Sequence, residues 1–170
     1  MVRRVALVLL CALACAGCEA SASIASVRDP STATRLQRLY IAVDRGSIDP
    51  LYAQSLGAAL YRELRARGVR VQMRVLSGLD LDERLVARDV AAWRPDGVLI
   101  VNFAGGSGIG VEVENANYDV SLIEAKTERR IWRAQVTSVR RLGTTEAMME
   151  EAAARVAERL ESDRLLAVAR

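Results

Sequence analysis

The stretch Gly97-Val98-Leu99-Ile100-Val101-Asn102-Phe103 is the most continuous apolar segment of the chain after its N-terminal region. A short apolar run without alternation is typical of a strand that is buried on both faces of a sheet. Pro95 lies just before the run and ends the element that precedes it, because the residue before a proline disfavours helical geometry. The run therefore predicts a central strand, covered by other elements on both faces.

Two strand-helix units come before this central strand. The segment 39–43 is compact and apolar, which predicts the first strand. Pro50 then provides a favourable first helical residue, and three leucines follow at a spacing of four residues, ending at Leu64. Gly68 is placed to end this helix as a left-handed cap. The unit thus resembles the first half of a strand-helix-strand crossover.

The second unit begins with 69–75, which alternates strictly between apolar and polar residues. Such alternation predicts a half-exposed strand at a sheet edge, or on a sheet with one wet face. Asp80 or Asp82 begins a second helix, which continues through Trp93. Helices between successive strands favour parallel pairing and right-handed crossovers.

The pattern changes after residue 104. The segments 111–125 and 130–140 alternate like a long hairpin with one apolar face, and we expect this hairpin to form an antiparallel edge. The period of two slips between Glu114 and Asn117, which predicts a bulge or two separate strands. Thr144 caps a final helix. The fold class is therefore α/β (α+β): a mixed sheet of about five strands, order β-α-β-α-β-β-β-α, with helices mainly on one face.

The N-terminus carries an export signal. Arg3 and Arg4 precede the apolar segment 5–13, and Ala16-Gly17-Cys18 follows. These last residues resemble the lipobox of bacterial lipoproteins, in which the cysteine becomes the first mature residue and carries acyl chains. The resemblance implies lipidation of Cys18, with an ordinary cleaved signal peptide as the alternative. The predicted organisation is a lipoprotein signal peptide at 1–17, a flexible tether at 18–35 and a single α/β periplasmic domain at 36–170.

Composition excludes several kinds of chemistry. All three cysteines lie at or before Cys18 and the chain contains no histidine, so disulfides, zinc-thiolate sites and a Ser-His-Asp triad are not expected. Lys126 is the single lysine. We therefore predict no catalytic residues, no metal site and no cofactor. The formal charge of only +3, with cations and acids interspersed, argues against a nucleic-acid partner.

Three clusters could still carry a function. The glycine-rich segment Gly105–Gly110 misses the spacing of a phosphate-binding loop and is interpreted as a flexible connection between strands, with a mobile loop that orders on a partner as the alternative. Asp44, Asp80, Asp82 and Asn102 follow predicted strands, where carboxylates could bind a metal or act as acid and base. We interpret them instead as helix-capping and turn residues.

The third cluster surrounds the predicted hairpin. It contains the arginines Arg129, Arg130, Arg133, Arg140 and Arg141, and the glutamates Glu112, Glu114, Glu124 and Glu128. The arginines could meet lipid headgroups or an acidic partner. Cross-strand ion pairs on a solvated face are the simpler interpretation. Trp93 and Trp132 fall on apolar stripes and are predicted to pack in the core.

The hairpin sequence resembles a recurring element of small Gram-negative envelope lipoproteins. The segments 118–127 and 130–134 are similar to a strand that ends in a D-A-K-T-G turn and returns through W-x-A, although Glu124 and Glu128 replace the aspartate and glycine. The order of elements also resembles the group formed by the TolB amino-terminal domain, LpoB, CsgG and the polysaccharide-export lipoprotein PelC. The resemblance implies this α/β fold and a non-enzymatic role.

The resulting hypothesis is a lipid-anchored assembly or binding module on the periplasmic face of the outer membrane. Its partners would be the membrane, through acyl chains on Cys18, and an envelope protein or polysaccharide machinery; another copy of the chain is a further candidate. Tethering would raise the local concentration of the domain for such a partner. The alternatives are an auxiliary ligand-binding lipoprotein of a transport system and a carboxylate-dependent hydrolase, which would need Asp44 and Asp82 in one cleft.

Overall fold

The computed structural model describes residues 20–44, 50–76, 85–109, 112–141 and 143–167. The elements within them are β1 (Ala20–Arg28), β2 (Arg38–Asp44), α2 (Pro50–Ala66), β3 (Arg70–Leu76), α3 (Leu85–Trp93), β4 (Gly97–Ile109), β5 (Glu112–Glu124), β6 (Arg130–Arg140) and α4 (Thr145–Ser162). The predicted α/β class and mixed sheet are confirmed. The sheet has six strands, because one strand precedes the predicted order.

The strands follow one another across the sheet in the order β1-β6-β5-β4-β2-β3. β2 is parallel to both β3 and β4, and the remaining neighbours are antiparallel. The expectations of a central β4 and an edge β3 are therefore confirmed. The predicted place of the β5-β6 hairpin at an edge is wrong, since β1 pairs with β6 and takes the edge itself.

The tether prediction for 18–35 is also wrong over Ala20–Arg28. These nine residues form β1, which runs antiparallel to β6 from the pair of Ala20 with Arg140 to the pair of Arg28 with Trp132. Ala22 and Ile24 face the core, while Ser23 and Val27 are exposed. The alanine and serine content that indicates a linker is compatible with a strand here, because small side chains fit beneath α4.

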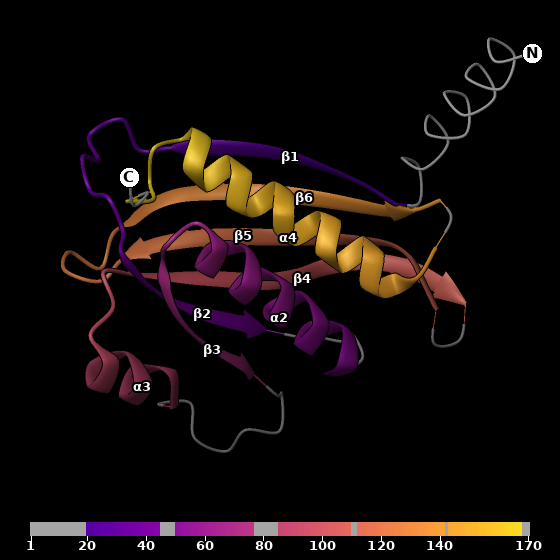
Figure 1. The fold of residues 1–170 in the computed structure, drawn as a ribbon, viewed down its shortest axis with the longest axis horizontal. Coiled ribbons are helices and arrows are strands. Elements are labelled where there is room, and N and C mark those ends of the chain that lie inside the picture. Colours follow the sequence, from indigo (N-terminus) through magenta and orange to yellow (C-terminus); the bar gives the residue numbers. More distant parts are fainter. Residues whose placement is uncertain (1–19, 45–49, 77–84, 110–111, 142, 168–170) are drawn as a thin grey trace, which may run out of the picture.

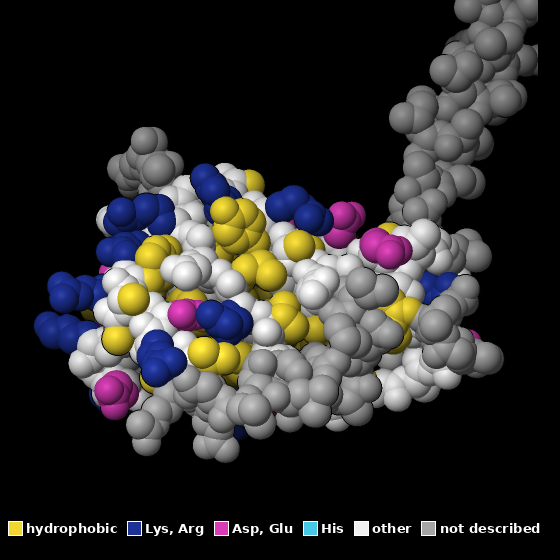
Figure 2. Space-filling view, turned by 90° about the horizontal axis from the view of Figure 1, so that it is seen from below, with side chains coloured by type: hydrophobic (Ala, Val, Ile, Leu, Met, Phe, Trp, Pro, Cys, Tyr) yellow, Lys and Arg dark blue, Asp and Glu magenta, His cyan; other side chains and the backbone are white. Residues whose placement is uncertain are grey.

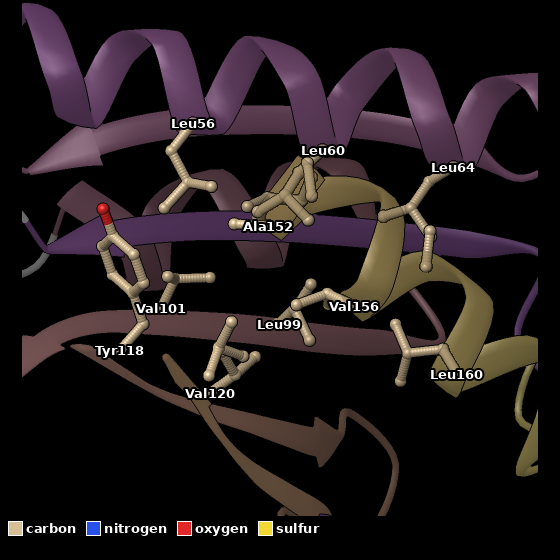
Figure 3. Packing of buried hydrophobic residues seen from close by; sticks show 14 of the residues in the cluster. Leu56, Leu60, Leu64, Leu99, Val101, Tyr118, Val120, Ala152, Val156 and Leu160 are labelled. Atoms are coloured by element: carbon tan, nitrogen blue, oxygen red, sulfur yellow. The ribbon is translucent and has the colours of Figure 1, made fainter. Parts of the chain in front are cut away.

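Helices cover both faces of the sheet unequally. Figure 1 shows α2 and α4 side by side across one face, with α3 apart from them near β3. Figure 3 shows the leucines of α2, Leu56, Leu60 and Leu64, packing toward β4 and α4. A smaller cluster around Tyr40, Ala42 and Val98 packs against α3 on the opposite face. The helices therefore lie mainly on one face, and β4 is covered from both sides at its start.

The glycine-rich segment is part of a strand. Gly105–Ile109 continues β4, so the prediction of a flexible connection there is wrong; Gly110 lies outside the described residues. The β4-β5 pairing shifts register between Ser107 and Gly108, whose partners Asn115 and Val113 leave Glu114 as an extra residue. This confirms the bulge predicted from the slip in alternation. A strand at this position cannot form the strand-to-helix turn that cradles a phosphate.

Candidate functional site

Cys18, the predicted lipidation site, is close in sequence to the first strand of the domain. Cys18 lies outside the described residues, two positions before the start of β1 at Ala20. No helix in the described ranges is both long enough and apolar enough to cross a bilayer. Lipidation of Cys18 thus stays a prediction, but the strand that follows it leaves little free chain between the two.

The far end of β1 is fixed by one carboxylate. Oδ2 of Asp163, just after α4, accepts hydrogen bonds from the Ser26 hydroxyl at 3.0 Å and from the Trp132 indole Nε1 at 2.7 Å. Arg28 donates to the backbone oxygen of Asp163 at 2.7 Å, and Arg159 donates to the Ser26 hydroxyl at 2.6 Å. β1, β6 and the end of α4 therefore form one hydrogen-bonded unit, which a loose tether would not.

Some of the predicted polar residues come together at the carboxyl ends of the parallel strands. Asp44 and Asn102 are register partners on β2 and β4, and Asn102 in turn pairs with Asp119 on β5. Asp44 and Asn102 are exposed. Asp80 and Asp82 lie outside the described residues, so their pairing with Asp44 stays a prediction. In the described part of the chain, no group of three or more acidic, histidine or cysteine residues could hold a metal ion.

The hairpin arginines are distributed over several partners. Arg129 pairs with Asp29, which follows β1, at 2.8 Å rather than with a glutamate of the hairpin. Arg140 donates to the backbone oxygen of Val113 at 3.1 Å. Arg130, Arg133 and Arg141 are exposed. The cross-strand pairing predicted for this cluster is therefore wrong at Arg129, which connects the hairpin to the segment after β1.

Aromatic residues anchor the two cores. Trp132 is 1% exposed, as predicted for a core residue. Trp93 is only half-buried, and the guanidinium of Arg38 stacks over its ring at 4.8 Å. Beneath α3, the Tyr40 hydroxyl and Arg74 Nε each donate to Oδ2 of Asp89 at 2.7 Å. These hydrogen bonds lower the pKa of Asp89, and the bond from Arg74 has the larger effect. They also connect α3 to β2 and β3.

An open recess, which the sequence does not indicate, lies at the end of the sheet where the parallel strands begin. This end is opposite to the one that carries Asp44 and Asn102. The recess has a volume of about 610 Å³ and lies where β2 and β4 begin, α3 ends and β5 turns into β6. Its lining includes three cations, Arg35, Arg94 and Lys126, and two carboxylates, Asp96 and Glu124. Sequence reasoning places ligands at the carboxyl ends of parallel strands, so nothing in the pattern points to the amino ends.

Both carboxylates of the recess are engaged within the protein. Oδ2 of Asp96 accepts hydrogen bonds from the backbone N–H groups of Gln37 and Arg38, each at 2.8 Å. Glu124 accepts hydrogen bonds from the hydroxyls of Thr127 and Thr34, which lower the pKa of the Glu124 carboxyl. The two acids thus hold the walls of the recess in place.

Comparison with solved structures identifies the fold. The chain shares the fold of PelC. The PelC dodecamer from Paraburkholderia phytofirmans matches with a TM-score of 0.56 and 16% identity, covering 88% of this chain and all of the other. A point variant of that PelC dodecamer matches with the same TM-score and coverage at 15% identity. No family model matches the sequence. No curated protein matches it either. The resemblance to PelC noted in the sequence is therefore confirmed at the level of fold.

Proposed function

We propose that this chain is a lipid-anchored, non-enzymatic envelope lipoprotein that serves as an assembly module on the periplasmic face of the outer membrane. Its first partner is another copy of itself, and its second is an envelope protein or polysaccharide machinery. The observation that carries the proposal is the PelC fold, seen in a dodecamer, directly after a lipobox.

The sheet offers suitable surfaces for assembly. β1 and β3 are its terminal strands, at opposite edges. Terminal strands present unpaired backbone groups that favour association with another chain. Two different edges on one subunit suit head-to-tail contacts, which close into rings when the rotation between subunits allows it. Val27, 69% exposed on β1, adds apolar surface beside one of these edges.

The short link to Cys18 favours a fixed orientation. Two residues span at most about 7 Å when extended, so acyl chains on Cys18 would hold the start of β1 close to the headgroups. A strand that is hydrogen-bonded to β6 along its length cannot swing freely. The end of the sheet at Ala20 would therefore face the membrane, and the β5-β6 turn would point away from it.

Membrane fractionation combined with mass spectrometry tests the anchor. The processed protein should begin at Cys18 and carry the added mass of acyl chains, and it should sediment with membranes. Cys18→Ala should leave the precursor unprocessed by lipoprotein maturation and without acyl chains. Cys15→Ala is the matched control, since it removes a cysteine of the same segment and should leave lipidation intact. An unmodified mature N-terminus would overturn the proposal.

The oligomeric state is tested separately. Light scattering of the detergent-solubilised protein, corrected for bound detergent, should give the mass of a closed homo-oligomer. A monomer at all concentrations would contradict self-assembly while leaving the anchor untouched. Crosslinking in intact cells, followed by identification of the attached proteins, would then name the second partner.

A further inference from the structure

The recess and the start of β1 lie at opposite ends of the sheet. β1 begins at Ala20, beside the end of β6, and finishes at Arg28 near the β5-β6 turn that borders the recess. A nine-residue strand is about 27 Å long. If Cys18 is anchored as proposed above, the recess opens away from the membrane, toward the periplasm.

The recess carries three cations that form no ion pair among the described residues. Arg35, Arg94 and Lys126 are exposed, and none of them forms an ion pair with a carboxylate in the described part of the chain. Lys126 lies close enough to Glu124 to contribute to its low pKa, after the two threonine hydroxyls. Asp96 and Glu124 accept hydrogen bonds from the protein, and the recess sets three cations against these two carboxylates. The cations have no ion pair among the described residues and can therefore contact an incoming anion.

The position of Arg94 is set by the backbone. Arg94 has a φ of 50°, and its N–H donates to the Val90 oxygen at 2.8 Å, the turn that ends α3 before Pro95. This conformation is unusual for a residue with a side chain and occurs at helix C-termini. The backbone of Arg94 is therefore held in a defined conformation where α3 ends at the recess.

The uncharged part of the lining is mostly aliphatic. Val90, Ala91, Pro95 and Ala125 line the recess, together with the polar residues Thr34 and Gln37. Sugar-binding sites commonly use aromatic faces, and none of the residues that line this recess is aromatic. A flat anionic bilayer would not enter a concave recess. Cationic and aliphatic residues in one recess fit a peptide segment that carries both acidic and apolar side chains.

Basic side chains gather at the end of the molecule that carries the recess. Figure 2 shows Lys and Arg side chains gathering at the left-hand end of the molecule, the end where α3 and the β5-β6 turn lie in Figure 1. A surface on which basic side chains predominate accelerates encounter with an acidic partner and helps to set its orientation. The recess lies at the same end of the molecule, by the end of α3 and the β5-β6 turn, so these side chains would guide an acidic segment toward it.

We propose that the recess lined by Arg35, Arg94 and Lys126 binds an acidic segment of a partner protein. Carboxylates of the segment pair with the three cations, and its apolar side chains contact the aliphatic residues between them. This binding does not require the lipid anchor; only the direction in which the recess faces rests on the proposed anchoring of Cys18. Loss of anchoring and loss of binding can therefore be observed independently.

Fluorescence anisotropy on the full-length processed protein in a neutral detergent tests this inference. The probe is a fluorescein-labelled nonapeptide of alternating Glu and Leu, and the reference probe has Gln in place of Glu. The double variant Arg35→Glu/Lys126→Glu should raise the Kd of the acidic probe at least about tenfold. The matched control Arg133→Glu/Arg141→Glu makes the same change in net charge at exposed positions outside the recess, and it should change the Kd by less than about threefold.

Three results would overturn the inference. The first is equal binding of the Glu and Gln probes, and the second is an equal loss of affinity in the recess and control variants. The third is displacement of the probe by oligogalacturonate or by inorganic phosphate at lower concentration than by unlabelled acidic peptide. The neutral variant Arg35→Gln/Lys126→Gln should weaken binding less than the charge reversal does. The unfolding transitions of both variants should match that of the wild type, which shows that the loss of binding is electrostatic and not caused by misfolding.

Discussion

The indole Nε1 of Trp132 donates a hydrogen bond to Oδ2 of Asp163 at 2.7 Å, across the boundary between β6 and the end of α4. Trp132 is almost fully buried, and the same carboxylate oxygen accepts the hydroxyl of Ser26 from β1. A buried indole N–H needs an acceptor, because leaving it unpaired costs its full desolvation. Asp163 therefore joins the edge strand, the neighbouring strand and the last helix.

Replacing this acceptor should destabilise the domain. Asp163→Ala leaves the Trp132 indole and the Ser26 hydroxyl without their partner, so we expect the free energy of unfolding to fall by about 2 kcal/mol. Urea denaturation followed by tryptophan fluorescence measures this. Glu158→Ala, which removes an exposed ion pair with Arg155, is the control and should cost less than about 1 kcal/mol. Equal losses in the two variants would contradict the role assigned to Asp163.

Hydrogen exchange distinguishes a strand from a tether at Ala20–Arg28. An edge strand paired on one side has amides that alternate between bonded and free. We therefore expect slow exchange at every second residue of β1 and fast exchange at the others, measured by NMR on the folded protein. Uniformly fast exchange from Ala20 to Arg28 would mean that β1 is not formed in solution.

The sequence pattern was sufficient for the elements whose hydrophobic period is strong. The leucines of α2, the alternation of β3 and the continuous apolar start of β4 each identify their element and its burial, because side-chain period follows backbone geometry directly. β1 was not predicted as a strand. Its alternation uses alanine and serine, which differ too little in hydropathy to show a period, and its burial depends on α4, more than a hundred residues away in the chain.

The recess could not be foreseen for a different reason. Arg35, Arg94 and Lys126 belong to three separate connections, and only the register of β2, β4 and β5 brings those connections to one end of the sheet. Pairing register depends on contacts distant in sequence. Asp44 and Asn102 are interpreted from the sequence as capping and turn residues, but both lie within strands, where the parallel register of β2 and β4 makes them partners.

Two glycines should respond differently to alanine. A Cβ at Gly106 would lie 2.3 Å from the backbone oxygen of Asn115, so β4 and β5 would have to separate locally. Gly106→Ala should therefore reduce the free energy of unfolding by about 1–3 kcal/mol. A Cβ at Gly57, in α2, would lie 3.0 Å from the flexible end of Met73 and in ordinary contact with Val43 Cγ2 at 3.4 Å. Since alanine favours helix over glycine by about 1 kcal/mol, Gly57→Ala should be neutral or stabilising. Thermal unfolding of both variants tests the contrast.

Tyr40 gives the domain a measurable dependence on alkaline pH. Burial, followed by the hydrogen bond to Asp89, raises the pKa of Tyr40 from its usual value of 10.0 to about 12. Between these values the unfolded chain loses the phenolic proton while the folded chain keeps it, so raising the pH favours unfolding. The contribution of Tyr40 to stability is thus fully present below pH 10 and lost as the pH approaches 12.

Urea midpoints measured at pH 9 and at pH 11 should therefore differ more for the wild type than for Tyr40→Phe. Tyr118, whose pKa is also raised by burial, contributes equally to both proteins. The same pH dependence in Tyr40→Phe as in the wild type would show that the Tyr40 hydroxyl titrates normally and is not held by Asp89.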